Sequence, residues 1–145
     1  MSNLITIPKD VKFELPEGRY RASICGYRTQ KNYTDNGLEE KAIILFDVQV
    51  PGLENFDCRA RKLLDLDLSS GSDMRYFLSG LLGREFFSSR SNQSVDLERE
   101  LVGKPCEISL FHKRTPSTKK HKFPFVDVDY MRPVTVGLQL ERGGL

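Results

Sequence analysis

The chain has 145 residues, the length of one domain with one hydrophobic core. It is 39% hydrophobic and 29% charged, and its net charge of +2 says little about partners. We expect no membrane span, because no run of about 18 apolar residues occurs, and no signal peptide. Three widely spaced cysteines argue against a disulfide framework and favour the cytoplasm.

The first strand is predicted to begin at Gly18. Apolar and polar residues alternate along "GRYRASI", and this period of two indicates a strand with one buried face. Residues 1–16 are expected to form an N-terminal arm, or an edge strand that ends at "LPEG". The segment "YRTQKNYTDNG" at residues 27–37 predicts a loop after it, with Asn36-Gly37 as the turn.

The second and third strands are predicted in "KAIILFDVQV" and "DCRARKLLDLDL". The first of these segments is rich in β-branched and aromatic residues, and Pro51-Gly52 ends it. Its residues on one shared face are Ala42, Ile44, Phe46, Val48 and Val50. In the other segment leucines alternate with Asp65 and Asp67, which predicts inward Leu64, Leu66 and Leu68 and outward carboxylates.

The hydrophobic period then changes to that of a helix in "SGSDMRYFLSGLLG". Ser72 can cap the start of this helix and Gly83 can end it, although Gly80 lies inside it. One helix face is formed by Met74, Phe77, Leu78, Leu81 and Leu82. "FFSSRSNQS" predicts a loop, and "VDLERELVGKP" predicts a second, short helix between Asp96 and Gly103.

The last two strands are predicted in "CEISLFH" and "FVDVDYM", with Tyr20 and Tyr130 expected in the core. The loop that joins these strands is "HKRTPSTKKHKFP", residues 112–124. It contains five lysines and arginines, both histidines of the chain and no acid. Residues 133–145 are expected to form a mobile C-terminal tail.

The order strand, strand, strand, helix, strand, strand is that of an OB fold. We therefore predict a mostly β protein: a five-stranded OB-fold-like Greek-key barrel at residues 17–132, with a helix between strands 3 and 4 and a short extra helix before strand 4. This fold binds oligonucleotides on strands 2 and 3 and with its 1-2 and 4-5 loops. The segments at residues 27–37 and 112–124 become these two loops, and "CRARK" begins strand 3.

Several spaced motifs resemble a family of small phage and prophage proteins that are presumed to bind single-stranded DNA. "PEGRYRASICGYR" is similar to their opening, "LFDV" to one of their strands and "RYFLSGLLG" to their helix, and "ELVGKPCEISL" resembles their spaced motif "L-x-G-K-x-x-x-v". The resemblance covers roughly residues 16–132, and it implies an OB-like barrel, single-strand binding and no catalysis. Many single-strand-binding proteins end in an acidic tail that recruits partners. Here "VTVGLQLERGGL" has one acid, which puts such recruitment in doubt.

Basic and aromatic residues are interleaved in the predicted loops. Lysine and arginine bind phosphates and release counterions, and aromatic rings stack on unpaired bases. Basic loops also occur as ordinary solvated surface, and lysines at strand ends prevent edge-to-edge aggregation. This is the alternative interpretation of the 112–124 loop. The candidate binding residues are Tyr27, Arg28, Lys31, Tyr33, Arg59, Arg61, Lys62, Lys113, Arg114, Lys119, Lys120, Lys122 and Phe123.

Other chemistry is weakly represented. The two histidines and three cysteines lack the spacing of a zinc site, so no metal and no cofactor are expected. Two carboxylate pairs, Asp65 with Asp67 and Asp127 with Asp129, could serve a metal-dependent nuclease. They alternate with apolar residues, however, as the outward face of a strand does.

We therefore predict a cytoplasmic, non-enzymatic protein that binds single-stranded DNA with little sequence preference in phage or prophage replication or recombination. Replication or recombination proteins are candidate partners, and formation of a homo-oligomer stays open. The alternatives are a structural or protein-binding β-barrel, such as a phage assembly part that uses Phe86, Phe87 and the N-terminal arm, and the nuclease.

Overall fold

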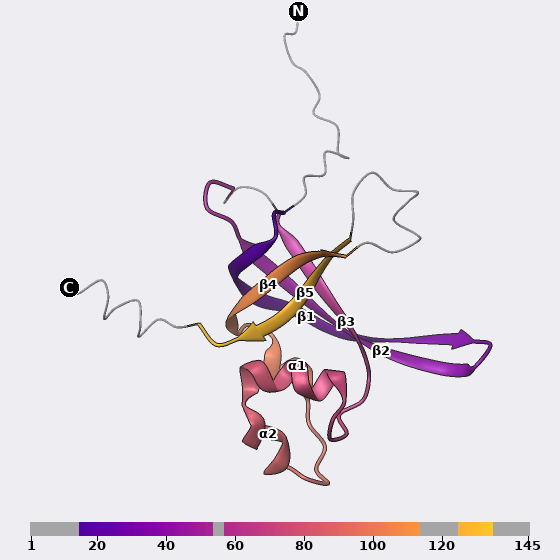
Figure 1. Ribbon diagram of the computed structural model, residues 1–145. Coiled ribbons are helices and arrows are strands. Elements are labelled where there is room, and N and C mark those ends of the chain that lie inside the picture. The colour runs from indigo at the N-terminus through magenta and orange to yellow at the C-terminus, as the bar shows by residue number, and fades with distance from the viewer. Residues whose placement is uncertain (1–14, 54–56, 114–124, 135–145) are drawn as a thin grey trace, which may run out of the picture.

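A single antiparallel sheet organises the chain in the computed structural model, which describes residues 15–53, 57–113 and 125–134 (Figure 1). The sheet has five strands in the order β3-β2-β1-β4-β5. They are β1 (Gly18–Thr34), β2 (Gly37–Gln49), β3 (Arg59–Asp65), β4 (Pro105–Lys113) and β5 (Phe125–Arg132). The helices are α1 (Asp73–Leu82), α2 (Arg84–Ser88) and α3 (Leu97–Leu101). The predicted mostly β architecture is therefore confirmed.

The sheet curls until its two edge strands, β3 and β5, lie beside each other. No backbone ladder joins these strands within the described residues, so the sheet is not closed. Between them lie the side chains of Lys62 and Asp127, whose Nζ and Oδ1 atoms are 3.6 Å apart. The closed barrel predicted from the sequence is thus replaced by an open sheet with an ion pair across its seam.

The predicted loop at residues 27–37 is wrong for most of its length. β1 continues through this segment to Thr34 and pairs with β2 as far as Thr34–Gly37. Only Asp35 and Asn36 form the turn, and Gly37 follows it with a φ of +111° that suits glycine. The result is a two-stranded ribbon, residues 27–34 with 37–44, which projects from the rest of the sheet (Figure 1).

The core lies on the concave side of the sheet. All five residues predicted to share a face of β2 lie in it or pack against it, with Ala42, Ile44 and Phe46 fully buried. Leu15, from the segment before β1, is buried there too. A register shift between Ser109 and Leu110 puts both Val128 and Met131 inside. Tyr130, predicted in the core, is instead half-buried outside the core cluster.

The α1 helix covers one end of the sheet, where it packs against β5 and β3 (Figure 1). Its predicted caps are confirmed: the Ser72 side chain accepts a hydrogen bond from the Arg75 backbone N–H, and the helix ends at Gly83. The short α3 helix is also confirmed, with Asp96 as its cap. The predicted loop at residues 86–94 is partly wrong, because α2 contains Phe86 and Phe87, and Phe87 is buried in the core. No described helix is long and apolar enough to cross a membrane.

Candidate functional site

Five arginines lie on the outward face of β1, β2 and β3. Successive residues of a strand point to opposite faces, and the cross-strand pairs fix which residues share the outward one. One row runs from Arg28 through Ile43 to Leu63, and the next from Gly26 through Leu45 to Arg61. We call this surface the arginine face and define it by Arg19, Arg21, Arg28, Arg59 and Arg61.

The centre of the arginine face is apolar. Ile43 is only 2% exposed although it lies outside the core cluster, whereas Leu63 is 50% exposed. Leu45 lies over Gly26, where an added Cβ would come within 3.0 Å of the Leu45 Cδ1 atom. Gly26 therefore leaves room for the Leu45 side chain, and the apolar strip of Ile43, Leu45 and Leu63 is exposed to solvent mainly at Leu63 and partly at Leu45.

Most of the arginines on this face keep their charge available. Arg59 forms an ion pair with Asp57, with its Nε atom 2.9 Å from Oδ1. Arg19, Arg21, Arg28 and Arg61 form no ion pair with any other residue that the structure describes. Asp65 at the edge of the face is bound by Lys41, and this hydrogen bond raises the pKa of Lys41. The face therefore combines arginines that have no ion pair within the described residues with two further carboxylates, because Asp47 lies opposite Arg59 and Glu107 lies opposite Arg21.

The structure separates residues that the sequence suggested would act together. Tyr27 and Arg28 are neighbours in a strand, so they point to opposite faces of the ribbon. Tyr27 packs against the core, and its burial raises its pKa. Lys31 and Tyr33 share the Tyr27 face farther out, where Tyr33 is 86% exposed. Arg28 therefore lies on one face of the ribbon and the two tyrosines lie on the other, whereas the sequence predicted all of them in a single loop.

Lys62 does not lie on the arginine face, although "RARK" places it next to Arg61. Its position pairs with Ile44, so it points inward to the seam beside Asp127. Only 17% of its side chain is exposed, and its Nζ atom lies 5.5 Å from the centre of the Phe77 ring. Within the described residues, the contacts of Lys62 are those of a group that holds β3 against β5.

The structure describes only the start of the basic 112–124 loop and the strands on either side of it. The backbones of Lys113 and Phe125 pair at the ends of β4 and β5. His112 is fixed at the base of the loop, where its backbone N–H donates to the Glu17 carboxylate at 2.8 Å. The other predicted binding residues of this segment lie outside the described residues: Arg114, Lys119, Lys120, Lys122 and Phe123.

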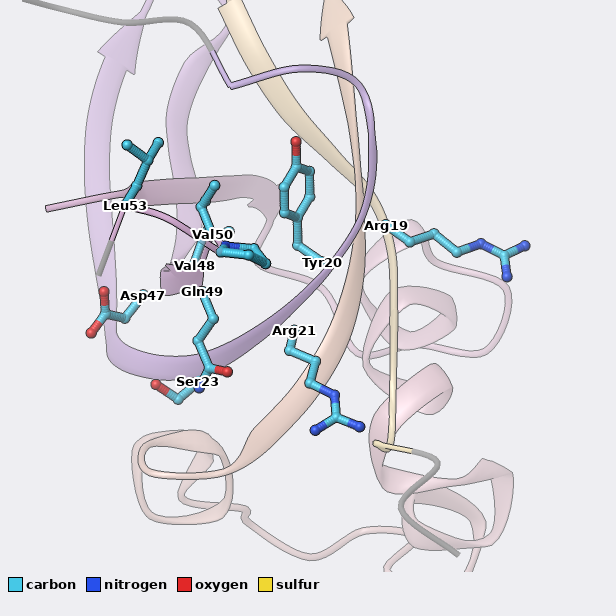
Figure 2. Close-up of a pocket in the computed structure, with 10 residues that line it drawn as sticks. Arg19, Tyr20, Arg21, Ser23, Asp47, Val48, Gln49, Val50 and Leu53 are labelled. Carbon is cyan, nitrogen blue, oxygen red and sulfur yellow. The ribbon is translucent and has the colours of Figure 1, made fainter. Parts of the chain in front are cut away.

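A cleft of about 580 Å³ adjoins the arginine face where β1 and β2 part. The last pair of this ladder is Arg21–Gln49; β2 then turns away through Pro51 and Gly52. Figure 2 shows the side chains around the opening, which we call the fork cleft. It is lined by Arg19, Tyr20, Arg21, Ser23, Asp47, Val48, Gln49, Val50, Pro51 and Leu53.

Three of the four carboxylates considered for a nuclease, Asp65, Asp127 and Asp129, line one pocket of about 360 Å³. Asp67 does not line it, and its carboxylate accepts a hydrogen bond from the Ser69 backbone N–H. Lys41 binds Asp65 and Lys62 faces Asp127, so lysine charges offset these carboxylates. Within the described part of the chain, no three acidic, histidine or cysteine side chains are grouped to hold a metal ion. The buried Cys106 thiol has its pKa raised to about 12 by burial, which disfavours the thiolate that metals bind.

Sequence reasoning missed Arg19 and Arg21. The alternation along "GRYRASI" places both arginines on the polar face of the first strand, but nothing in that segment connects them with the other basic clusters. The signal was present, because arginines at alternate positions of a strand mark its solvated face. Their link to Arg28 and Arg61 depends on pairing of β1 with β2 and of β2 with β3, which no single segment reveals.

Comparison with protein-family models, with curated proteins and with solved structures finds no match to this chain.

Proposed function

We propose that this protein binds single-stranded DNA on the arginine face, without catalysis and with little sequence preference. The resemblance to phage and prophage single-strand-binding proteins suggests a role in replication or recombination. The observation that carries the proposal is the arginine face itself. Arg19, Arg21, Arg28 and Arg61 form no ion pair with any residue that the structure describes, and the partly exposed Leu45 and Leu63 lie in the rows of Arg61 and Arg28.

The arrangement of the sheet supports an OB-like frame. β1 pairs with β2 along most of its length and with β4 through residues 18–23. The α1 helix lies between β3 and β4 in the chain and packs at the end of the sheet beside β3 and β5. In an OB-fold barrel the face of strands 2 and 3 binds oligonucleotides, and here that face carries Arg59 and Arg61. An OB-like Greek-key arrangement with an open seam is therefore part of the proposal.

The chemistry of the face suits a single strand better than a duplex. Unpaired nucleotides expose both phosphates and the flat surfaces of bases, whereas a duplex hides those surfaces within its stack. A guanidinium can pair with a phosphate and can also stack on a base. The apolar strip can lie against sugars and bases, so Arg28 and Leu63 in one row offer complementary contacts.

Titration of fluorescent oligo-dT at several salt concentrations tests this proposal. Each phosphate contact contributes roughly 0.7 to the slope of log affinity against log salt for a single strand. Replacing Arg28 and Arg61 together by Ala should therefore weaken binding and flatten the slope by about 1.4.

Arg84→Ala is the matched control, because Arg84 is exposed on α2, away from the arginine face. It should bind oligo-dT as the wild type does. Equal losses in the double variant and the control would refute a specific role of the arginine face. Absence of any oligo-dT binding by the wild type would refute the function itself.

The alternative of a protein-binding β-barrel has one observation in its favour. Tyr33 and Leu38 form a cross-strand pair near the tip of the ribbon, and both are exposed. Such a pair could insert into a partner protein, as a phage assembly part would require. In that case oligo-dT would give no signal at any salt concentration. A nuclease would instead shorten a labelled strand when Mg²⁺ is added, and we expect no cleavage.

A further inference from the structure

The fork cleft has an apolar half and a polar half. Tyr20, Val50 and Leu53 point to the same side of the cleft (Figure 2). Ser23 and Gln49 lie on the other side of the strands, in the rows that continue the arginine face. A ligand that enters from the arginine face would therefore pass from polar groups to apolar ones within one opening.

The aromatic wall of the cleft is held in place. The Tyr20 hydroxyl donates a hydrogen bond of 2.7 Å to the Pro16 carbonyl oxygen. A tyrosine hydroxyl is protonated at neutral pH and can donate this bond, and burial raises the pKa of Tyr20 further. The phenol group is thus fixed at its far end while the ring lines the cleft, and a flat ligand would meet a surface that is already ordered.

Arg19 and Arg21 give the cleft a cationic flank for the two phosphates of one nucleotide, and the carboxylate of Asp47, opposite Ser23, also lines the cleft. Arg19 and Arg21 lie on alternate residues of β1 and point away from Tyr20, Val50 and Leu53 (Figure 2). A nucleotide whose base turned into the cleft would leave its phosphates outside, next to these guanidinium groups. The Gln49 amide carries donors and an acceptor, so it can meet the edge of any base.

We infer that the fork cleft holds one unstacked base of a single strand bound on the arginine face. This inference rests on the proposed function and adds a defined position to it. Base insertion at the cleft is separate from the phosphate contacts of Arg28 and Arg61, so each can fail without the other.

Photo-crosslinking with an oligonucleotide that contains 5-iodouracil tests the inference directly, because this base forms adducts with aromatic side chains close to it. Irradiation of the complex with the full chain should place the adduct on Tyr20. Adducts found only on other residues, such as Tyr33, would overturn the cleft as a base site while leaving single-strand binding intact. If the full chain binds no oligonucleotide at all, the proposed function itself is refuted, and not only the base site in the cleft.

A bulky side chain in the cleft gives an independent measurement. Leu53→Trp should weaken oligo-dT binding roughly tenfold, the effect of losing one stacked base. It should leave the salt slope unchanged, because no phosphate contact is lost. Val102→Trp is the control, since Val102 is exposed and lies outside the cleft and the arginine face. Equal affinities of the two variants would overturn the inference. If thermal unfolding shows that Leu53→Trp does not fold, the crosslinking result decides.

Discussion

Gly80 shows how a residue unfavourable for local structure can be required by packing. A Cβ atom at this position would lie 2.2 Å from the Met131 carbonyl oxygen, so α1 can approach β5 only because Gly80 has no side chain. Helix propensity alone predicts that Gly80→Ala gains about 1 kcal/mol. We expect the opposite sign: overpacking should lower the free energy of unfolding by about 1–3 kcal/mol, measured by urea denaturation.

Tyr76→Ala on the same helix serves as the control for this prediction. Tyr76 is 82% exposed, so its replacement should change the free energy of unfolding by no more than about 0.5 kcal/mol. A more stable Gly80→Ala variant would mean that α1 does not lie against Met131 as described. The sequence predicted the helix and marked Gly80 as its weak point. It did not reveal the strand behind the glycine, because that contact joins distant segments.

Lys62 is a residue whose placement the alternation of β3 could have predicted. Leu64 was expected to point inward, and a residue two positions away shares its face. The charge of the "RARK" cluster favoured a phosphate contact instead. In the structure the inward side chain of Lys62 lies at the seam beside Asp127. The alternation of the strand therefore predicts the position of Lys62 better than the basic composition of the segment does.

The ribbon of β1 and β2 sets how far the interface can extend. Tyr33 lies near its tip on the face opposite to Arg28, so a strand on the arginine face must cross the ribbon edge to reach it. If the bound strand does so, Tyr33→Ala should weaken oligo-dT binding by about 1–3 kcal/mol through loss of a stacked base. Fluorescence titration measures this, and Tyr33→Phe, which keeps the ring, should bind like the wild type.

Tyr76→Ala again gives a matched comparison, because it removes an equally exposed tyrosine from α1. Unchanged affinity in Tyr33→Ala would confine the interface to the arginine face and the fork cleft. Sequence reasoning placed this segment in a loop because the ribbon projects into solvent on both faces. Residues 28–34 are all exposed and all but Tyr33 are polar, so the alternation that identifies a strand disappears there.

At the scale of the whole molecule, the order of elements was predictable and the closure of the sheet was not. Hydrophobic periods and turn residues belong to single segments, and they gave the five strands, α1 and α3 in the right order. Closure depends on how β3 and β5 meet, and these strands are far apart in the sequence. Shifts of register near Cys25 and Ser109 also change which side chains face inward. The split of the candidate site over two faces, by contrast, follows from the alternation of successive residues within β1 and β3.

The rates at which the three cysteine thiols react with a thiol reagent test whether the core of the protein is intact. Cys25 is exposed at the irregularity of β1, whereas Cys58 and Cys106 are buried in the core. Burial raises the pKa of both buried thiols, that of Cys106 to about 12, so at neutral pH they are protonated as well as shielded. Because thiolates are the reactive form, a thiol reagent at neutral pH should modify Cys25 quickly and the other two only through unfolding.

Absorbance after addition of Ellman's reagent measures this prediction, and Cys25→Ser should lack the fast phase. Adding urea should release the two slow thiols together, since Cys106 on β4 and Cys58 beside β3 belong to the same core. Fast reaction of Cys106 in the native protein would show that β1 and β4 separate readily. The arginine face would then lack a rigid support, because Arg19 and Arg21 lie on the part of β1 that pairs with β4.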